Sequence, residues 1–199
     1  MHMKKIYLIA CFLGGLVFTQ SSFSFVHFEP MAGYQLQTLK LVDLTNTTQE
    51  FKSDAPLVGA KFGIKTPFGI SLELVGTYAE GKAKSTPTVT QDPNFTHTVG
   101  SVQLGVSAMY LMKLYLGYIF TSEYQIKSNA LFPGLKLNGT GYQAGLAFYF
   151  FRDWSLSFNY NVHQFKKISG PTYLLGDDVK SYYSKSDLAD VSTYLSYSF

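Results

Sequence analysis

Side chains suited to acid–base chemistry occur at three places that one fold could bring together. Glu123, His163 and Asp190 lie on three different predicted strands, each nine or ten residues from the end of its strand that is joined by a short turn or carries the C-terminus. Ser192 follows Asp190 by two positions. A histidine held by a carboxylate beside a serine is the arrangement that activates a hydroxyl nucleophile. The alternative is that these groups fill the fold interior as hydrogen-bonded polar side chains. We favour this alternative and expect no catalytic residue.

A second group of charged side chains, Glu29, Lys61 and Glu73, has the same inward phase as the first. Counting from a turn centred on Pro67 places Lys61 opposite Glu73, each about six residues from the turn. A buried charge without a partner is costly, so we predict an ion pair between them. A structural polar plug is the favoured role, and a gate or proton pathway is the alternative. The predicted interior network comprises Lys61, Glu73, Glu123, His163 and Asp190.

The remaining residues do not have the spacing of a metal-binding or cofactor-binding site. His27, His97 and His163 fall on separate predicted elements without metal-ligand spacing. The one cysteine, Cys11, excludes a disulfide scaffold and a cysteine-rich metal site. The 17 glycines are scattered and form no phosphate-binding loop. We therefore expect no metal and no cofactor.

The composition is rich in aromatic residues and poor in charge. The 199 residues are 46% hydrophobic, 17% aromatic and only 15% charged, where about 25% charged is usual for soluble domains. Intrinsic disorder requires the opposite balance. A net charge of +3 over this length is too small for a nucleic-acid-binding surface, so no nucleic-acid partner is expected.

The N-terminal segment 1–24 has the features of a secretory signal peptide. Lys4 and Lys5 precede an apolar run that ends at Phe18, and small residues precede a cleavage point before residue 25. The run is too short for a membrane span of about 20 residues, although a retained anchor is one alternative. Cys11 in a lipoprotein-type box is another. Cleavage would remove Lys4 and Lys5, lower the net charge from +3 to +1, and leave 25–199 as a single domain.

After residue 25 the recurring pattern is strict alternation of apolar and polar side chains, which is the period of a β-strand. No sustained helical period and no second long apolar run occurs. The predicted strands are each about 10 to 14 residues long, and a tilted strand needs about 9–11 residues to cross a bilayer. They are 26–38, 56–65, 69–80, 101–110, 114–127, 141–150, 155–163 and 189–199.

The connections between these strands alternate between short and long. Short turns are predicted at 66–68, 112–113 and 151–154, and the four other connections are long and polar. An even number of antiparallel strands with short turns at one end and long loops at the other describes a transmembrane β-barrel. We predict an eight-stranded antiparallel up-and-down barrel with short periplasmic turns and long extracellular loops. The predicted loops are 39–55, 81–97, 128–139 and 166–187.

The phase of the alternation distinguishes a membrane barrel from a soluble barrel of the lipocalin kind. The face opposite the apolar one carries mostly Gly, Ser, Gln and Asn, which suits a narrow barrel interior rather than a water-exposed surface. Aromatic residues gather at two levels, as expected at the two membrane interfaces. The short-turn group is Phe68, Tyr110, Phe150, Phe151, Trp154, Tyr197 and Phe199, and the long-loop group is Tyr34, Tyr78, Tyr124 and Tyr142.

The last six residues, Tyr194-Leu195-Ser196-Tyr197-Ser198-Phe199, resemble the terminal assembly signal of bacterial outer-membrane barrels. Tyr197 and Phe199 match its two aromatic positions, whereas Tyr194 stands where the family often has Gly. The layout of 25–199 is similar to that of the small barrels typified by OmpX and the OmpA barrel domain. The resemblance implies outer-membrane location, insertion by the outer-membrane assembly machinery, and contact with outer-membrane lipid and lipopolysaccharide.

For function, we expect a non-enzymatic outer-membrane barrel with a polar, plugged interior. It would act structurally, or in adhesion to surface ligands through loops 39–55, 81–97, 128–139 and 166–187. One alternative is a narrow channel or a conduit for small or hydrophobic solutes, as in OmpW-like barrels. A lipid A-modifying enzyme is another, but the deacylase pattern needs a Ser two residues after its His. Phe165, Val99 and Glu29 occupy that position.

Overall fold

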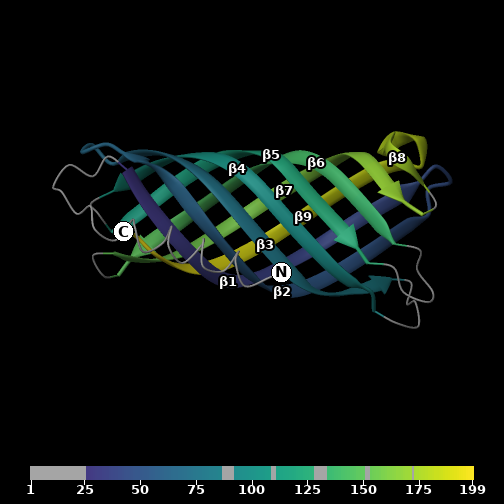
Figure 1. Ribbon diagram of the computed structural model, residues 1–199, viewed down its shortest axis with the longest axis horizontal. Coiled ribbons are helices and arrows are strands. Elements are labelled where there is room, and N and C mark those ends of the chain that lie inside the picture. Colours follow the sequence, from purple (N-terminus) through teal and green to yellow (C-terminus); the bar gives the residue numbers. More distant parts are fainter. Residues whose placement is uncertain (1–25, 87–91, 109–110, 128–133, 151–152, 172) are drawn as a thin grey trace, which may run out of the picture.

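The computed structural model describes residues 26–199 except 87–91, 109–110, 128–133, 151–152 and 172. The predicted signal peptide 1–24, with Cys11, lies outside the described residues, as do Tyr110 and Phe151 of the predicted short-turn aromatic group. Figure 1 shows one elongated barrel of tilted strands. No helix in the described part of the chain is long and apolar enough to cross a membrane.

Eight strands form the closed barrel, which confirms the predicted fold. All neighbouring strands are antiparallel, β1 pairs with β9, and β6–β7 pairing completes the ring. The barrel strands are β1 (Val26–Asp43), β2 (Thr48–Lys65), β3 (Ile70–Thr86), β4 (Asn94–Ala108), β5 (Met112–Ile126), β6 (Leu135–Tyr149), β7 (Trp154–Gly170) and β9 (Tyr183–Tyr197). A short strand β8 (Tyr173–Asp178), paired with the end of β7, and a 3-10 helix η1 (Val179–Ser181) fill the connection from β7 to β9.

The strands are longer than the sequence pattern predicts. They contain 15 to 18 residues. The predicted loops 39–55, 81–97, 128–139 and 166–187 are therefore wrong in extent, because strand continues into each of them. Between β1 and β2 only residues 44–47 lie outside strand. The prediction failed because it ended each strand where the outward-facing residues cease to be apolar.

The polarity of the barrel reverses along its length. In the half nearest the short turns, here called the lipid-facing half, the exterior is apolar and the interior polar. Its exterior includes Phe62, Leu74, Leu104, Leu116, Phe158 and Leu195, all between 40% and 70% exposed. The exterior aromatics Tyr34, Tyr78, Tyr118, Tyr142 and Tyr160 lie where this belt ends. Such a belt bounded by aromatic side chains is the surface that a barrel presents to lipid.

In the other half, here called the distal half, the arrangement is inverted. The exterior carries charged side chains such as Lys40, Lys52, Glu80 and Lys84. The interior is a continuous apolar core, as in a soluble protein. The main members of this distal core are Leu39, Leu41, Phe51, Phe95, Tyr124, Ile126, Leu137, Phe165, Ile168 and Leu188.

Two of the predicted orientations are wrong because of a β-bulge in β5. The pairing of β5 with β6 shifts between Ile119 and Ser122, so two successive residues face outward and the alternation then continues in the opposite phase. Tyr124 therefore points into the distal core rather than joining the exterior aromatics. Glu123 faces outward rather than into the interior, and its carboxylate lies 2.8 Å from the Nζ of Lys136.

The β2–β3 turn sets a register that differs from the predicted one by two residues. Residues 66–69 lie outside strand, with Gly69 at φ +83°, a conformation that glycine adopts without steric cost. The turn is therefore centred on residue 68, and Lys61 pairs with Val75 rather than with Glu73. The predicted turn at 112–113 is also displaced, because both residues belong to β5.

Candidate functional site in the barrel interior

Five buried side chains form a charged cluster inside the lipid-facing half. Lys61 Nζ lies 3.3 Å from a carboxylate oxygen of Glu29, its direct cross-strand partner on β1. Glu73 accepts hydrogen bonds from Lys113 and Gln103, and His27 Nε2 lies 3.1 Å from it. This polar cluster, defined as His27, Glu29, Lys61, Glu73 and Lys113, lies on β1, β2, β3 and β5.

The predicted pairing of Lys61 with Glu73 is wrong, although both side chains are interior. The two-residue register difference moves Glu73 toward the short turns and beside Lys113. Sequence reasoning missed Lys113 because it assigned this residue to a turn. Its alternation with Tyr115, which is also interior, is the signal that could have identified it. Gly105 gives this lysine room, since a Cβ there would lie 2.5 Å from Lys113 Cε.

Charge balance indicates a structural role for the polar cluster. The ligand atoms of His27, Glu29 and Glu73 lie within 4.8 Å of one another, close enough to bind a metal ion. However, Lys61 and Lys113 already neutralise the two carboxylates. A divalent cation would add two uncompensated positive charges to a buried site, which is costly. The geometry therefore favours a hydrogen-bonded plug without a metal.

Two histidines form a second polar group farther along the barrel. His163 Nε2 lies 2.8 Å from Asp190 Oδ2, so the structure joins these two predicted network residues. His97 Nε2 lies 3.1 Å from Ser122 Oγ, and its ring centroid lies 4.9 Å from that of His163. The serine and the carboxylate thus contact different histidines. All four side chains are at most 1% exposed, which leaves a substrate no access to them.

The remaining candidate, Ser192, does not contact His163. Its hydroxyl accepts a hydrogen bond from Asn159 Nδ2 at 3.4 Å. Glu123, the third predicted acid–base residue, lies outside the barrel beside Lys136. The described residues therefore do not form the hydrolytic arrangement considered from the sequence.

The interior of the barrel is almost completely filled by side chains. Between the polar cluster and the distal core, a cavity of about 20 Å³ is lined by polar residues such as Gln35, Asn161 and Ser192. That volume suits about one water molecule. Beyond it the distal core closes the bore, with Leu39, Leu137 and Leu188 each 0% exposed. At this level the described side chains fill the bore.

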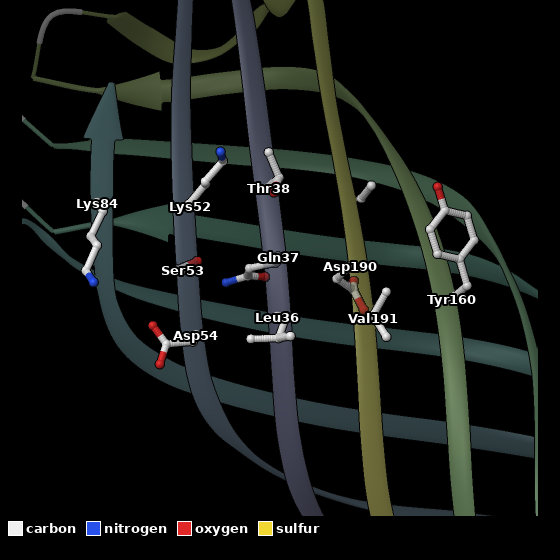
Figure 2. A pocket seen from close by; sticks show the side chains of 11 residues that line it. Leu36, Gln37, Thr38, Lys52, Ser53, Asp54, Lys84, Tyr160, Asp190 and Val191 are labelled. Carbon is white, nitrogen blue, oxygen red and sulfur yellow. The ribbon is translucent and has the colours of Figure 1, made fainter. Parts of the chain in front are cut away.

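A larger hollow of about 560 Å³ lies at the outer surface, where the apolar belt meets the charged exterior (Figure 2). Its lining spans β3, β2, β1, β9 and β7. Figure 2 shows Lys52 and Lys84 at one end of the hollow and Tyr160 at the other. It is named the rim groove below, and its outward-facing lining comprises Leu36, Thr38, Lys52, Asp54, Lys84, Tyr160, Ala189 and Val191.

Tyr197 and Phe199, the two positions of the predicted assembly signal, belong to an aromatic group at the short-turn end. The ring centroid of Tyr197 lies 5.2 Å from that of Trp154 and 4.8 Å from that of Phe199. The Phe199 amide donates a hydrogen bond to the Phe28 carbonyl at 3.0 Å, which fixes the C-terminus against β1. Recognition of these residues by an assembly machinery stays a prediction.

A closed eight-stranded barrel with an apolar belt and a filled polar interior has the architecture of the small bacterial outer-membrane barrels. Ail of Yersinia pestis, bound to the heparin analogue sucrose octasulfate, superposes with a TM-score of 0.58 at 11% identity, over 87% of this chain and 99% of Ail. Neisserial surface protein A also gives a TM-score of 0.58 at 11% identity, over 86% of this chain and 97% of that protein. No protein-family model and no curated protein sequence matches the chain. At this identity the likeness establishes the fold.

Proposed function

We propose that this protein is a non-enzymatic, non-conducting barrel of the bacterial outer membrane that displays its distal half for attachment to other surfaces. The observation that carries the proposal is the reversal of polarity along the strands. β1 continues nine residues beyond Tyr34, from the apolar belt to Asp43. At about 3.3 Å per residue and a tilt of about 40°, this places the tip roughly 20 Å beyond the belt.

The distal half has the construction of a folded domain in water. Its core is apolar, its exterior is charged, and its strands hold the connections in place. Function in such barrels usually lies in segments carried by a rigid scaffold. The Yersinia neighbour is described as an attachment invasion locus protein, which is consistent with such a role for this architecture. The filled interior argues against the conduit, and the inaccessible histidines argue against the enzyme.

Attachment can be tested by expressing the full chain in a non-adherent Gram-negative host. We expect cells carrying the protein to bind immobilised extracellular matrix or cultured cells more than cells with an empty vector. The matched control replaces the distal tip residues 44–47 with Gly-Ser while retaining the barrel. Membrane fractionation and heat-modifiable gel mobility verify insertion of both proteins. If cells with the inserted wild-type protein bind no more than cells with an empty vector, the attachment role is contradicted.

Conductance in planar bilayers provides the second test. We expect no single-channel current above background from the purified barrel, because the distal core and the polar cluster fill the bore. Reproducible conductance steps would contradict the plugged interior and favour the conduit.

Mass spectrometry of lipid A from the same cells should show no mass shift, whereas a lost or added acyl chain would indicate an enzyme.

A further inference from the structure

We propose that the rim groove binds one phosphorylated glycolipid molecule of the outer leaflet, with its phosphate held by Lys52 and Lys84. The groove lies at the level where the apolar belt gives way to the charged exterior. A ligand at this level must satisfy lipid on one side and water on the other. A glycolipid with acyl chains and phosphate groups has this combination.

The shape of the groove follows from two rows of residues across the sheet. In the lower row, Leu36 pairs with Val191 and Val191 pairs with Tyr160, giving an apolar surface continuous with the belt. In the upper row, Thr38 lies between Ala189 and Lys52. Small side chains at Thr38 and Ala189, flanked by longer ones, leave the hollow seen in Figure 2. The lower row suits an acyl chain, and the upper row suits a polar headgroup.

Two lysines face the headgroup level from adjacent strands. Lys52 on β2 pairs directly with Lys84 on β3, so their side chains leave the same face at the same height. Neighbouring like charges on a sheet repel each other, and an anion bound between them removes that repulsion. Lys52 also lies 3.1 Å from Glu50. Within the described part of the chain, no carboxylate lies within ion-pair distance of Lys84.

One acid, Asp54, belongs to the outward-facing lining, and Figure 2 shows its carboxylate on the same side as Lys84. Asp54 accepts a hydrogen bond from the Tyr34 hydroxyl at 2.5 Å, on the side of the apolar belt. Lys side chains extend several methylenes and direct their charge to the level of lipid phosphates, as at other membrane interfaces. Each such lysine contributes roughly 1 kcal/mol near an anionic membrane surface, equal to about fivefold in affinity.

The experiment uses the full barrel in detergent micelles and native mass spectrometry, with bis-phosphorylated lipid A as the probe. We expect a 1:1 adduct with wild-type protein. Lys52→Gln with Lys84→Gln should weaken binding by about tenfold or more, from two lost phosphate contacts. Lys136→Gln with Lys166→Gln removes the same charge from β6 and the distal end of β7 and should change binding less than about twofold. Equal losses in the two double variants would overturn the assigned site.

Further arms separate the groove from general charge attraction. Ala189→Phe keeps every charge and fills the groove, so it should abolish the adduct, and undiminished binding would overturn the proposal. Dephosphorylated lipid A and phosphatidylglycerol should each bind at least tenfold more weakly than the probe. If excess inorganic phosphate displaces the probe, the site recognises free phosphate and the lipid assignment is wrong. Heat-modifiable mobility of every variant verifies that the barrel has folded.

Discussion

The two halves of the barrel are built from the same strands with opposite polarity. In the lipid-facing half Leu116 is 70% exposed and points outward, while Glu73 is 1% exposed and points inward. In the distal half Leu39 is 0% exposed and inside, while Lys52 lies outside. Apolar side chains gain nothing from leaving lipid, so the lipid-facing interior is held by hydrogen bonds and ion pairs. In the proposed arrangement the distal half stands in water, and burial of apolar area stabilises it.

Disruption of the polar cluster should cause the greatest loss in the free energy of unfolding. Glu73→Ala leaves Lys113 and His27 without their shared acceptor, and removing one partner of a buried ion pair costs about 3–5 kcal/mol. We expect this loss in the free energy of unfolding, measured by urea titration in lipid vesicles with gel mobility as the readout. Glu123→Ala, which breaks an exposed pair with Lys136, should cost about 0–1 kcal/mol. Similar losses in both variants would show that the polar cluster does not hold the lipid-facing half.

The second prediction concerns the distal core. Leu39→Ala should cost about 2–5 kcal/mol, as expected for a leucine in a packed aqueous-type core. Leu44→Ala at the exposed tip of the same hairpin should change stability by less than about 0.5 kcal/mol. Hydrogen exchange of the distal strands should rise in the first variant while the lipid-facing strands stay protected. Equal responses at the two positions would contradict a folded apolar core above the membrane.

A double substitution tests whether the polar interior depends on charge or on filled volume. Lys61→Met alone leaves the Glu29 carboxylate without its lysine and should cost about 3 kcal/mol or more. Adding Glu29→Gln removes the second charge and should restore stability to within about 1 kcal/mol of wild type, because paired removal of buried charges is close to neutral. If the double variant is less stable than the single, the ion pair itself supplies stability beyond filling the bore.

The smallest predicted effect is confined to the distal tip. Hydrogen bonds from the Thr45 side chain and the Thr47 amide lower the pKa of the exposed Asp43 carboxyl. A lowered pKa means that the carboxylate stabilises the turn above its unfolded pKa, and that this contribution is lost as pH falls through the folded value. Asp43→Asn should therefore speed exchange of the Thr47 amide at neutral pH. The difference from wild type should disappear in acid, and a pH-independent difference would contradict this origin.

The sequence predicted the lipid-facing half better than the distal half. Alternation of Leu156, Phe158 and Tyr160 with serine and asparagine identified both the strand and its outward face. The same alternation continues through Leu39, Lys40 and Leu41, but there the apolar residues point inward. If lipid is assumed to surround the whole barrel, polar residues on the outward face are taken as the start of a loop. The period of two itself continues, and it predicts longer strands when no surrounding medium is assumed.

The interior partners could not be obtained from the sequence because they depend on register. A two-residue change at the turn before Gly69 is enough to exchange the partner of Glu73 from Lys61 to Lys113. A bulge in β5 reverses the orientation of Glu123. Neither feature alters the local apolar pattern strongly, since each affects only one or two residues. Contacts between side chains on non-neighbouring strands, such as His97 and His163, add a further dependence on the curvature of the closed barrel.

The alternation along the chain was enough to predict an eight-stranded barrel with an apolar exterior and small polar residues inside, because a period of two specifies both the strand and its outward face. The tertiary structure decided where that polarity reverses, which charges pair in the interior, and that the bore is filled. Those properties depend on register, bulges and closure, which bring together residues far apart in the chain. The rim groove likewise depends on five neighbouring strands, which place small residues between long ones.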